Sequence, residues 1–178
     1  MKTSLALVAL ILFLAPAQAA ADGTAKSGLA QAIQLGKKWQ PDAVLTSIGT
    51  PGADANGKSR LWQYDFYSKK TKGCARVNLP KDQEPFIHRY PSCVAGKPIS
   101  AEFVDSPAAI DEAKRNGFKP GDLVNITLDH SKDRLLKPGR ECWTISSEHD
   151  FDRAKAVTRG WGVGPKTGKF IMRLSGER

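Results

Sequence analysis

Hydrophobic and polar residues alternate with two periods along this 178-residue chain, and the two periods predict helices and strands in a repeated order. Apolar residues at three- and four-residue spacing predict a helix at about 25–40. Two-residue alternation is clearest at 61–67, where Trp62, Tyr64 and Phe66 share one face of a predicted strand. Further strands are expected at 43–48, 74–79 and 86–90, with a loop rich in Gly and Pro at 49–57.

The second half of the chain repeats this order. Ser106 is expected to be the N-cap of a helix with Pro107 at its first position, and Gly117 is expected to end it. Strands are expected at 123–128, 142–146, 156–163 and 170–174. In the last strand, alternation places Phe170, Met172 and Leu174 toward the core and Arg173 outward.

Landmarks recur at a similar spacing in the two halves, which predicts an internal duplication. Pro41 corresponds to Pro120 and Trp62 to Trp143. The strings at 86–90 and 170–174 both read Phe-Ile-x-Arg followed by a large apolar or aromatic residue. The expected fold is therefore α+β with two similar modules, at 20–98 and 99–178. Each module would pack one helix on a four-stranded antiparallel sheet.

The first 19 residues have the features of a secretory signal peptide. Lys2 precedes an apolar run from Leu5 to Leu14, and Ala17-Gln18-Ala19 supplies small residues for cleavage. The alternative, a membrane anchor, is disfavoured because the run is too short for a hydrocarbon core of about 30 Å. We therefore expect an exported protein, periplasmic or extracellular, without stable membrane insertion.

Charge and cysteine content refine this expectation. The net charge of +9 suits anionic partners or simple solubility, and nucleic acid is not expected in an exported protein. Export permits a disulfide, and three cysteines leave one over. The register of the predicted hairpin places Cys74 near Tyr90, which favours a Cys74–Cys93 bridge. A Cys93–Cys142 bridge between the modules remains the alternative.

The sequence contains no set of residues with the spacing of a catalytic or metal site. His88, His130 and His149 lack metal-ligand spacing, so no metal, cofactor or catalytic residue is assigned. A hydrolase with His130, His149 and Asp150 between the modules is kept as a weaker alternative.

Two features are candidates for binding a partner. One is a basic loop that carries Lys132, Arg134, Lys137 and Arg140 and would suit anionic cell-envelope ligands. The other is Trp161, which lies between glycines and would serve as an exposed anchor for a protein. The alternative for Trp161 is a core position against the second helix. Trp39, Trp62 and Trp143 are expected to lie in the core.

The end of the second half resembles the PepSY family. A helix precedes an antiparallel meander, and the run from Val163 to Phe170 contains Thr167-Gly168-Lys169 in its turn. The turn Asp usual in that family is absent, and the first half lacks Thr-Gly-Lys. The resemblance implies a cystatin/PepSY-like fold in tandem and a non-catalytic module that binds an envelope or extracellular protein. It further implies a regulatory role or one like that of peptidase or lysozyme inhibitors.

Overall fold

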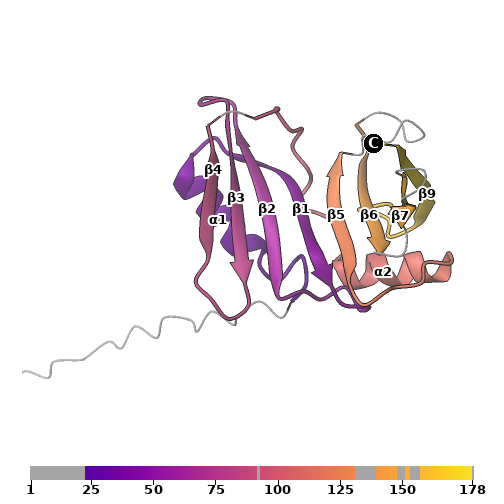
Figure 1. Cartoon of the computed structure of the whole chain (residues 1–178). Coiled ribbons are helices and arrows are strands. Elements are labelled where there is room, and N and C mark those ends of the chain that lie inside the picture. Colours follow the sequence, from indigo (N-terminus) through magenta and orange to yellow (C-terminus); the bar gives the residue numbers. More distant parts are fainter. Residues whose placement is uncertain (1–22, 92, 131–138, 148–150, 153–156, 178) are drawn as a thin grey trace, which may run out of the picture.

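The computed structural model describes residues 23–91, 93–130, 139–147, 151–152 and 157–177. They form one antiparallel sheet of nine strands and two α-helices (Figure 1). The elements of the first half are α1 (Leu29–Trp39), β1 (Val44–Ala53), β2 (Leu61–Ser68), β3 (Gly73–Pro80) and β4 (Phe86–Tyr90). Those of the second half are α2 (Ser106–Arg115), β5 (Val124–His130), β6 (Glu141–Ser147), β7 (Phe151–Asp152), β8 (Val157–Val163) and β9 (Phe170–Glu177). The expected α+β class is confirmed.

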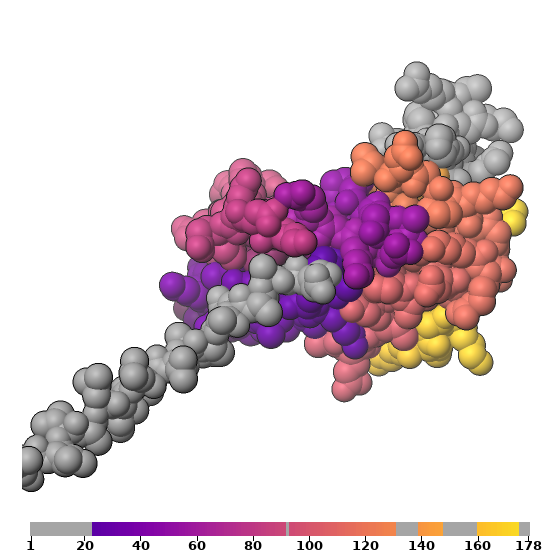
Figure 2. Space-filling model, turned by 90° about the horizontal axis from the view of Figure 1, so that it is seen from below, coloured from indigo at the N-terminus to yellow at the C-terminus, as the bar shows by residue number. Residues whose placement is uncertain are grey.

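The sheet continues from one half of the chain into the other. Its strands follow the order β4-β3-β2-β1-β5-β6-β8-β7, and β9 also pairs with β8. The two halves meet where β1 pairs antiparallel with β5, with Ile48 opposite Leu128 and Gly49 opposite Thr127. In the space-filling view, the indigo-to-magenta half lies directly against the orange half (Figure 2). The strands of the two halves therefore share backbone hydrogen bonds as well as side-chain contacts.

Both helices cover the same face of this sheet. Ile48 lies opposite Tyr64 on one side and Leu128 on the other, and Leu128 lies opposite Trp143, so these four side chains share a face. They belong to one buried cluster that also includes Ile110 of α2. One hydrophobic core thus runs beneath both helices, and we call the opposite surface of the sheet the helix-free face.

Trp62 and Trp143 connect the sheet to the two helices in the same way. The indole Nε1 of Trp62 donates to the carbonyl of Gly23 at 2.7 Å, and that of Trp143 donates to the carbonyl of Val104 at 3.0 Å. Both carbonyls precede a helix in the chain, and both indoles are buried. The predicted core positions of these two tryptophans are confirmed.

Strand β1 is longer than the sequence predicts. It runs through the expected loop as far as Ala53, because β5 supplies a neighbour for its second half. The register between β1 and β5 shifts between Thr50 and Ala53, and Pro51 lies in this irregular stretch. Proline is tolerated at such a place because a bulge needs no ladder hydrogen bond from it.

The start of α2 also differs from the prediction. The N-cap is Asp105, whose Oδ1 accepts from the amide of Ser106 at 2.8 Å and from that of Lys26 at 3.0 Å. Ser106 is the first helical residue and is buried. Its hydroxyl donates to the carbonyl of Gly57 at 2.7 Å and accepts from the amide of Ala25 at 3.1 Å. Ser106 therefore ties α2 to the first half instead of capping its own helix.

The side chains of β9 alternate out of the predicted phase. The register of β8 and β9 shifts between Gly162 and Val163, so Phe170 lies opposite Val163 while Met172 lies opposite Gly162. A bulge of this kind reverses the faces beyond it. Phe170 packs on the main core as expected, but Met172 and Leu174 form a small second cluster with Cys142 on the helix-free face.

The Cys74–Cys93 disulfide is present, with Cα atoms 6.0 Å apart, and Cys74 lies opposite Tyr90 as predicted. This pairing excludes the alternative bridge between Cys93 and Cys142. Cys142 is buried, and its Sγ donates to the carbonyl of Trp143. Among the described residues, no helix is long and apolar enough to cross a membrane.

Candidate binding surface on the helix-free face

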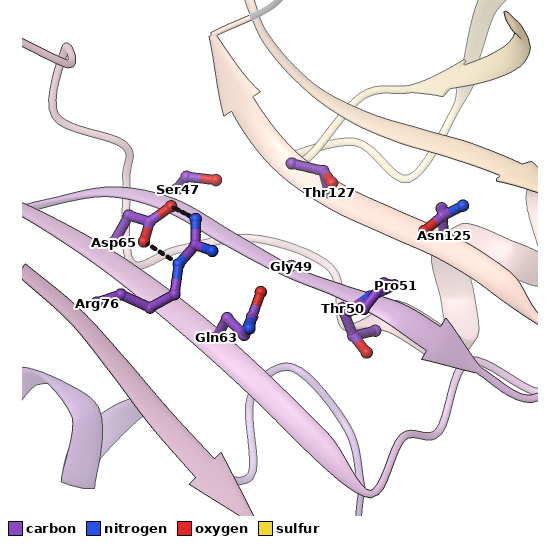
Figure 3. Close-up of a pocket in the computed structure, with 9 residues that line it drawn as sticks. All are labelled: Ser47, Gly49, Thr50, Pro51, Gln63, Asp65, Arg76, Asn125 and Thr127. Carbon is purple, nitrogen blue, oxygen red and sulfur yellow. Dashed lines mark hydrogen bonds and ion pairs between the residues drawn. The ribbon is translucent and has the colours of Figure 1, made fainter. Parts of the chain in front are cut away.

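The helix-free face of the first half carries a polar groove that crosses into the second half. Two hollows of about 200 and about 300 Å³ share Ser47, Asp65 and Arg76. The first hollow extends over β1 to Asn125 and Thr127 of β5 (Figure 3). We call these two hollows together the polar groove. It is lined by Thr46, Ser47, Gly49, Thr50, Pro51, Gln63, Asp65, Cys74, Arg76, Tyr90, Val94, Gly96, Lys97, Asn125, Thr127, Asp129 and His130.

An ion pair lies at the centre of the groove. Asp65 of β2 and Arg76 of β3 are cross-strand neighbours, and Arg76 donates through Nε at 2.7 Å and through its terminal nitrogen at 2.9 Å (Figure 3). The Asp65 carboxylate raises the pKa of Arg76 above its already high ordinary value. Because both side chains are about one-third exposed, this bond contributes about 1 kcal/mol or less. It fixes two charged groups at the base of the groove.

His130 lines the second of the two hollows. Its Nδ1 lies 2.7 Å from the carbonyl oxygen of Gly139, and its Nε2 lies 2.9 Å from that of Pro98. The neighbouring Glu141 accepts a hydrogen bond from the amide of Ser100 at 2.9 Å. These bonds hold the connection between the halves against the ends of β5 and β6.

Gly49 keeps the floor of the groove open. It lies between Gln63 of β2 and Thr127 of β5 in the middle of β1. A Cβ atom at this position would lie 3.0 Å from the carbonyl oxygen of Ile126 and 3.2 Å from Oγ1 of Thr127. A larger residue would therefore press on β5 as well as fill the hollow.

A second feature, which we call the basic corner, lies beside the Tyr90 end of β4. Lys69, Lys70 and Lys72 occupy the exposed turn between β2 and β3, and Lys37 and Lys38 occupy the last turn of α1. Asp42, which follows α1 in the chain, links the helix end to the turn between β2 and β3. Its carboxylate accepts from the hydroxyl of Ser68 at 2.8 Å and from the amide of Lys70 at 2.9 Å. The hydrogen bond from Lys70, with a second from Ser68, lowers the pKa of Asp42.

Of the residues proposed from sequence to bind a partner, the structure describes Arg140 and Trp161, and neither lines this groove. Lys132, Arg134 and Lys137 lie outside the described residues, and Arg140 is exposed just before β6. Trp161 is 8% exposed, donates from Nε1 to the carbonyl of Asn116, and packs 5.0 Å from the ring of Phe118. The expectation of an exposed anchor is therefore wrong for Trp161, whose glycine neighbours lie in a paired strand.

Sequence reasoning missed both the basic corner and the groove, and only the first of them leaves a signal in the sequence. The three lysines at 69–72 are visible as a charged turn between two strands. The groove is not visible, because it depends on the pairing of β1 with β5 and on the path of residues 94–100 across their ends.

Charged and titratable side chains of the groove make hydrogen bonds within the protein. Asp65 is held by Arg76, and both ring nitrogens of His130 face backbone carbonyls. No group of three or more His, Cys, Asp or Glu side chains that could hold a metal ion occurs within the described residues. His149 and Asp150 of the alternative hydrolase site lie outside them.

Comparisons with protein-family models, with curated proteins and with solved structures gave no significant match, so the proposals below rest on the sequence and the geometry of this chain.

Proposed function

We propose that this chain is an exported, non-catalytic binding protein that uses the polar groove on its helix-free face to contact an envelope or extracellular protein. Its role would be regulatory or like that of peptidase or lysozyme inhibitors. The observation that carries the proposal is the groove itself. It is open on a face that neither helix covers, and its central charged groups are already held in structural bonds.

Export is supported by two features of different kinds. The first 19 residues have the pattern of a signal peptide, although they lie outside the described residues. The Cys74–Cys93 bridge is typical of proteins in oxidising compartments. The location proposed is the periplasm or the outside of the cell.

A tandem PepSY-like architecture, with modules at 20–98 and 99–178, belongs to the same proposal. It is supported by the matching order of one helix and a meander in each half and by the equivalent hydrogen bonds of Trp62 and Trp143. The pairing of β1 with β5 would then join the first strand of each module.

A pull-down with matched variants tests the function. Asn125→Arg and Thr127→Arg together place two long, positively charged side chains in the groove. The core is not altered, because both positions lie on the helix-free face. We expect them to abolish recovery of a partner that the wild-type protein retains. Gln34→Arg, on an exposed position of α1, should retain it. Equal recovery with all three proteins, or none with the wild type, would count against the proposal.

A second candidate function is the binding of anionic envelope ligands. The basic corner favours it, because five exposed lysines gather there and Asp42 is engaged by Ser68 and Lys70. This function predicts that affinity for an anionic polymer falls steeply between low salt and about 0.15 M salt, where exposed charges are screened within about 8 Å. Affinity that is independent of salt would exclude it.

A further inference from the structure

Strand β4 is an exposed edge of the sheet with no proline and little charge among its own residues. It stands at the end of the strand order, and β3 is its neighbour. Natural edge strands are commonly short and carry charges or prolines that prevent pairing with other chains. Here Pro85 and Pro91 flank the strand, but its five residues are Phe-Ile-His-Arg-Tyr, and Arg89 carries its one fixed charge.

Exposed apolar side chains gather along this strand. The large hydrophobic residues exposed in the described part of the chain are Phe86 (51%), Tyr90 (37%), Val94 (92%) and Leu123 (54%). Three of these four lie on β4 or just beyond it. Such clustering marks an interaction surface more often than scattered exposure does.

The aromatic residues of β4 face the same way as the polar groove. Phe86, His88 and Tyr90 lie opposite Asn78, Arg76 and Cys74, and thus project onto the helix-free face. The rings of His88 and Tyr90 are 4.5 Å apart, and Tyr90 and Val94 line the groove. The disulfide between Cys74 and Cys93 fixes the Tyr90 end of this row of aromatic residues. A ligand would therefore meet a largely preorganised surface, which reduces the entropic cost of binding.

The charges around β4 differ at its two ends. The basic corner, with Lys69, Lys70 and Lys72, adjoins Tyr90, because Gly73 follows these lysines and Cys74 pairs with Tyr90. Near Phe86 lie Asp82, which pairs with Arg60, and Glu84. This polarity suits a ligand with acidic groups at the Tyr90 end.

We propose that an extended acidic segment of a partner protein binds as an added strand along β4. Its backbone would pair with the free edge, its apolar side chains would pack on Phe86 and Tyr90, and its acidic residues would lie at the basic corner. Strand addition is a common mode of peptide recognition in which the main chain supplies affinity and side chains supply specificity. This inference rests on the proposed binding function and names the partner's chemistry.

Other occupants fit these observations less well. An anionic polymer would use the basic corner but has no need of a strand edge or of exposed aromatic rings. A second copy of this chain would bring another net charge of +9 to the interface, whereas an acidic peptide brings the opposite charge. An acidic peptide uses the edge, the rings and the charges together.

The test is selection of ligands from a random twelve-residue peptide library on the protein without its first 19 residues. We expect enrichment of sequences that combine β-branched residues with Asp or Glu, and amide NMR shifts on binding that are largest in β4. Phe86→Ser with Tyr90→Ser should weaken the selected peptides at least tenfold. Leu123→Ser removes an equally exposed apolar residue elsewhere and should leave affinity unchanged.

Four outcomes would overturn the inference. One is selection of no peptide, or of peptides without acidic residues. Another is that the protein binds polyglutamate and polyphosphate, that this binding is lost in a triple variant with Lys69, Lys70 and Lys72 all changed to Gln, and that Phe86→Ser with Tyr90→Ser leaves it unaffected. The third is concentration-dependent self-association through β4 in sedimentation. If Asn125→Arg with Thr127→Arg still abolishes capture of a protein partner that the β4 variants retain, the proposed function stands and this inference fails.

Discussion

At the scale of single residues, the same kind of hydrogen bond recurs in the two halves and links the sheet to the segment before each helix. Trp62 and Trp143 each fill a core position and donate to a backbone carbonyl ahead of a helix. A carbonyl inside the protein that loses its donor costs about 1–3 kcal/mol, and Trp143→Phe would remove the indole donor to Val104. In Trp62→Phe the Gly23 carbonyl would keep the bond from the amide of Ser59 at 2.6 Å, so this cost should be smaller.

Trp143→Phe should therefore lower the free energy of unfolding by about 2–4 kcal/mol, from the lost hydrogen bond and the lost ring volume. Trp62→Phe should lower it by about 1–3 kcal/mol, mainly from the lost ring volume. Urea denaturation measures the change. Tyr90→Phe, which removes a polar atom from an exposed ring, should alter it by less than about 0.5 kcal/mol. Equal effects for the three variants would show that the indole bonds contribute nothing specific.

Two carboxylates should make the protein sensitive to acid. The amide of Phe170, assisted by Arg115, lowers the pKa of Glu112 below its ordinary value of 4.5, and the bond from Lys70 lowers that of Asp42 below 3.8. A depressed pKa in the folded state stabilises the protein above the unfolded-state pKa, and this stability is lost as pH falls through the folded-state pKa.

The expected loss of stability therefore begins below about pH 4.5 and increases toward lower pH. In denaturation measured at pH 7 and at pH 3, Glu112→Gln and Asp42→Asn should each reduce the difference between the two values. Asp122→Asn, at an exposed position, is the matched control. Unchanged pH dependence in both test variants would contradict the assigned hydrogen bonds.

At the scale of elements, α2 is attached to the first half by polar groups, of which Ser106 is buried. The hydroxyl of Ser106 bonds both Gly57 and Ala25, and Asp105 bonds Lys26. Ser106→Ala would leave a buried carbonyl and a buried amide without this partner. We expect a loss of about 2–4 kcal/mol in the free energy of unfolding, against about 0.5 kcal/mol or less for Ser27→Ala, whose hydroxyl bonds are exposed. Similar small losses in both would contradict the role of Ser106.

Most helices and strands could be predicted because their patterns are local. The alternation in Leu61–Ser68 and the Gly117 stop, where φ is 90°, follow from adjacent residues. The extension of β1 through Pro51 could not be predicted, since a strand from the other half supports it. The bulge in β9 reversed the faces of Met172 and Leu174, and alternation alone cannot locate a bulge.

The similarity of the two Phe-Ile-x-Arg strings did not predict the different surroundings of their first residues. Phe86 is exposed at an edge, whereas Phe170 packs on the core. The same string therefore presents an exposed phenylalanine in one strand and a packed one in the other. The candidate site was only partly predictable for the same reason: the charged turn at 69–72 is local, but the polar groove needs contacts between residues from both halves.

At the scale of the whole molecule, the continuous sheet and the shared core predict a single unfolding unit. Calorimetric and van't Hoff enthalpies should agree, and tryptophan fluorescence should change together with far-ultraviolet circular dichroism. Reduction of the Cys74–Cys93 bridge should lower the free energy of unfolding by about 2–4 kcal/mol, and the protein should still unfold in one transition. Two separated transitions would mean that the halves fold independently despite the pairing of β1 with β5.

At this scale the helix-free face is the proposed binding surface, and site-specific photo-crosslinking tests this proposal most directly. A photoreactive residue would replace Gln63 or Asn125 in the groove, or exposed Ala30 or Gln34 on α1, in the cells that produce the protein. We predict a discrete adduct with another protein from Gln63 and Asn125, and none from Ala30 and Gln34. Adducts from the α1 positions alone, or from no position, would contradict the account.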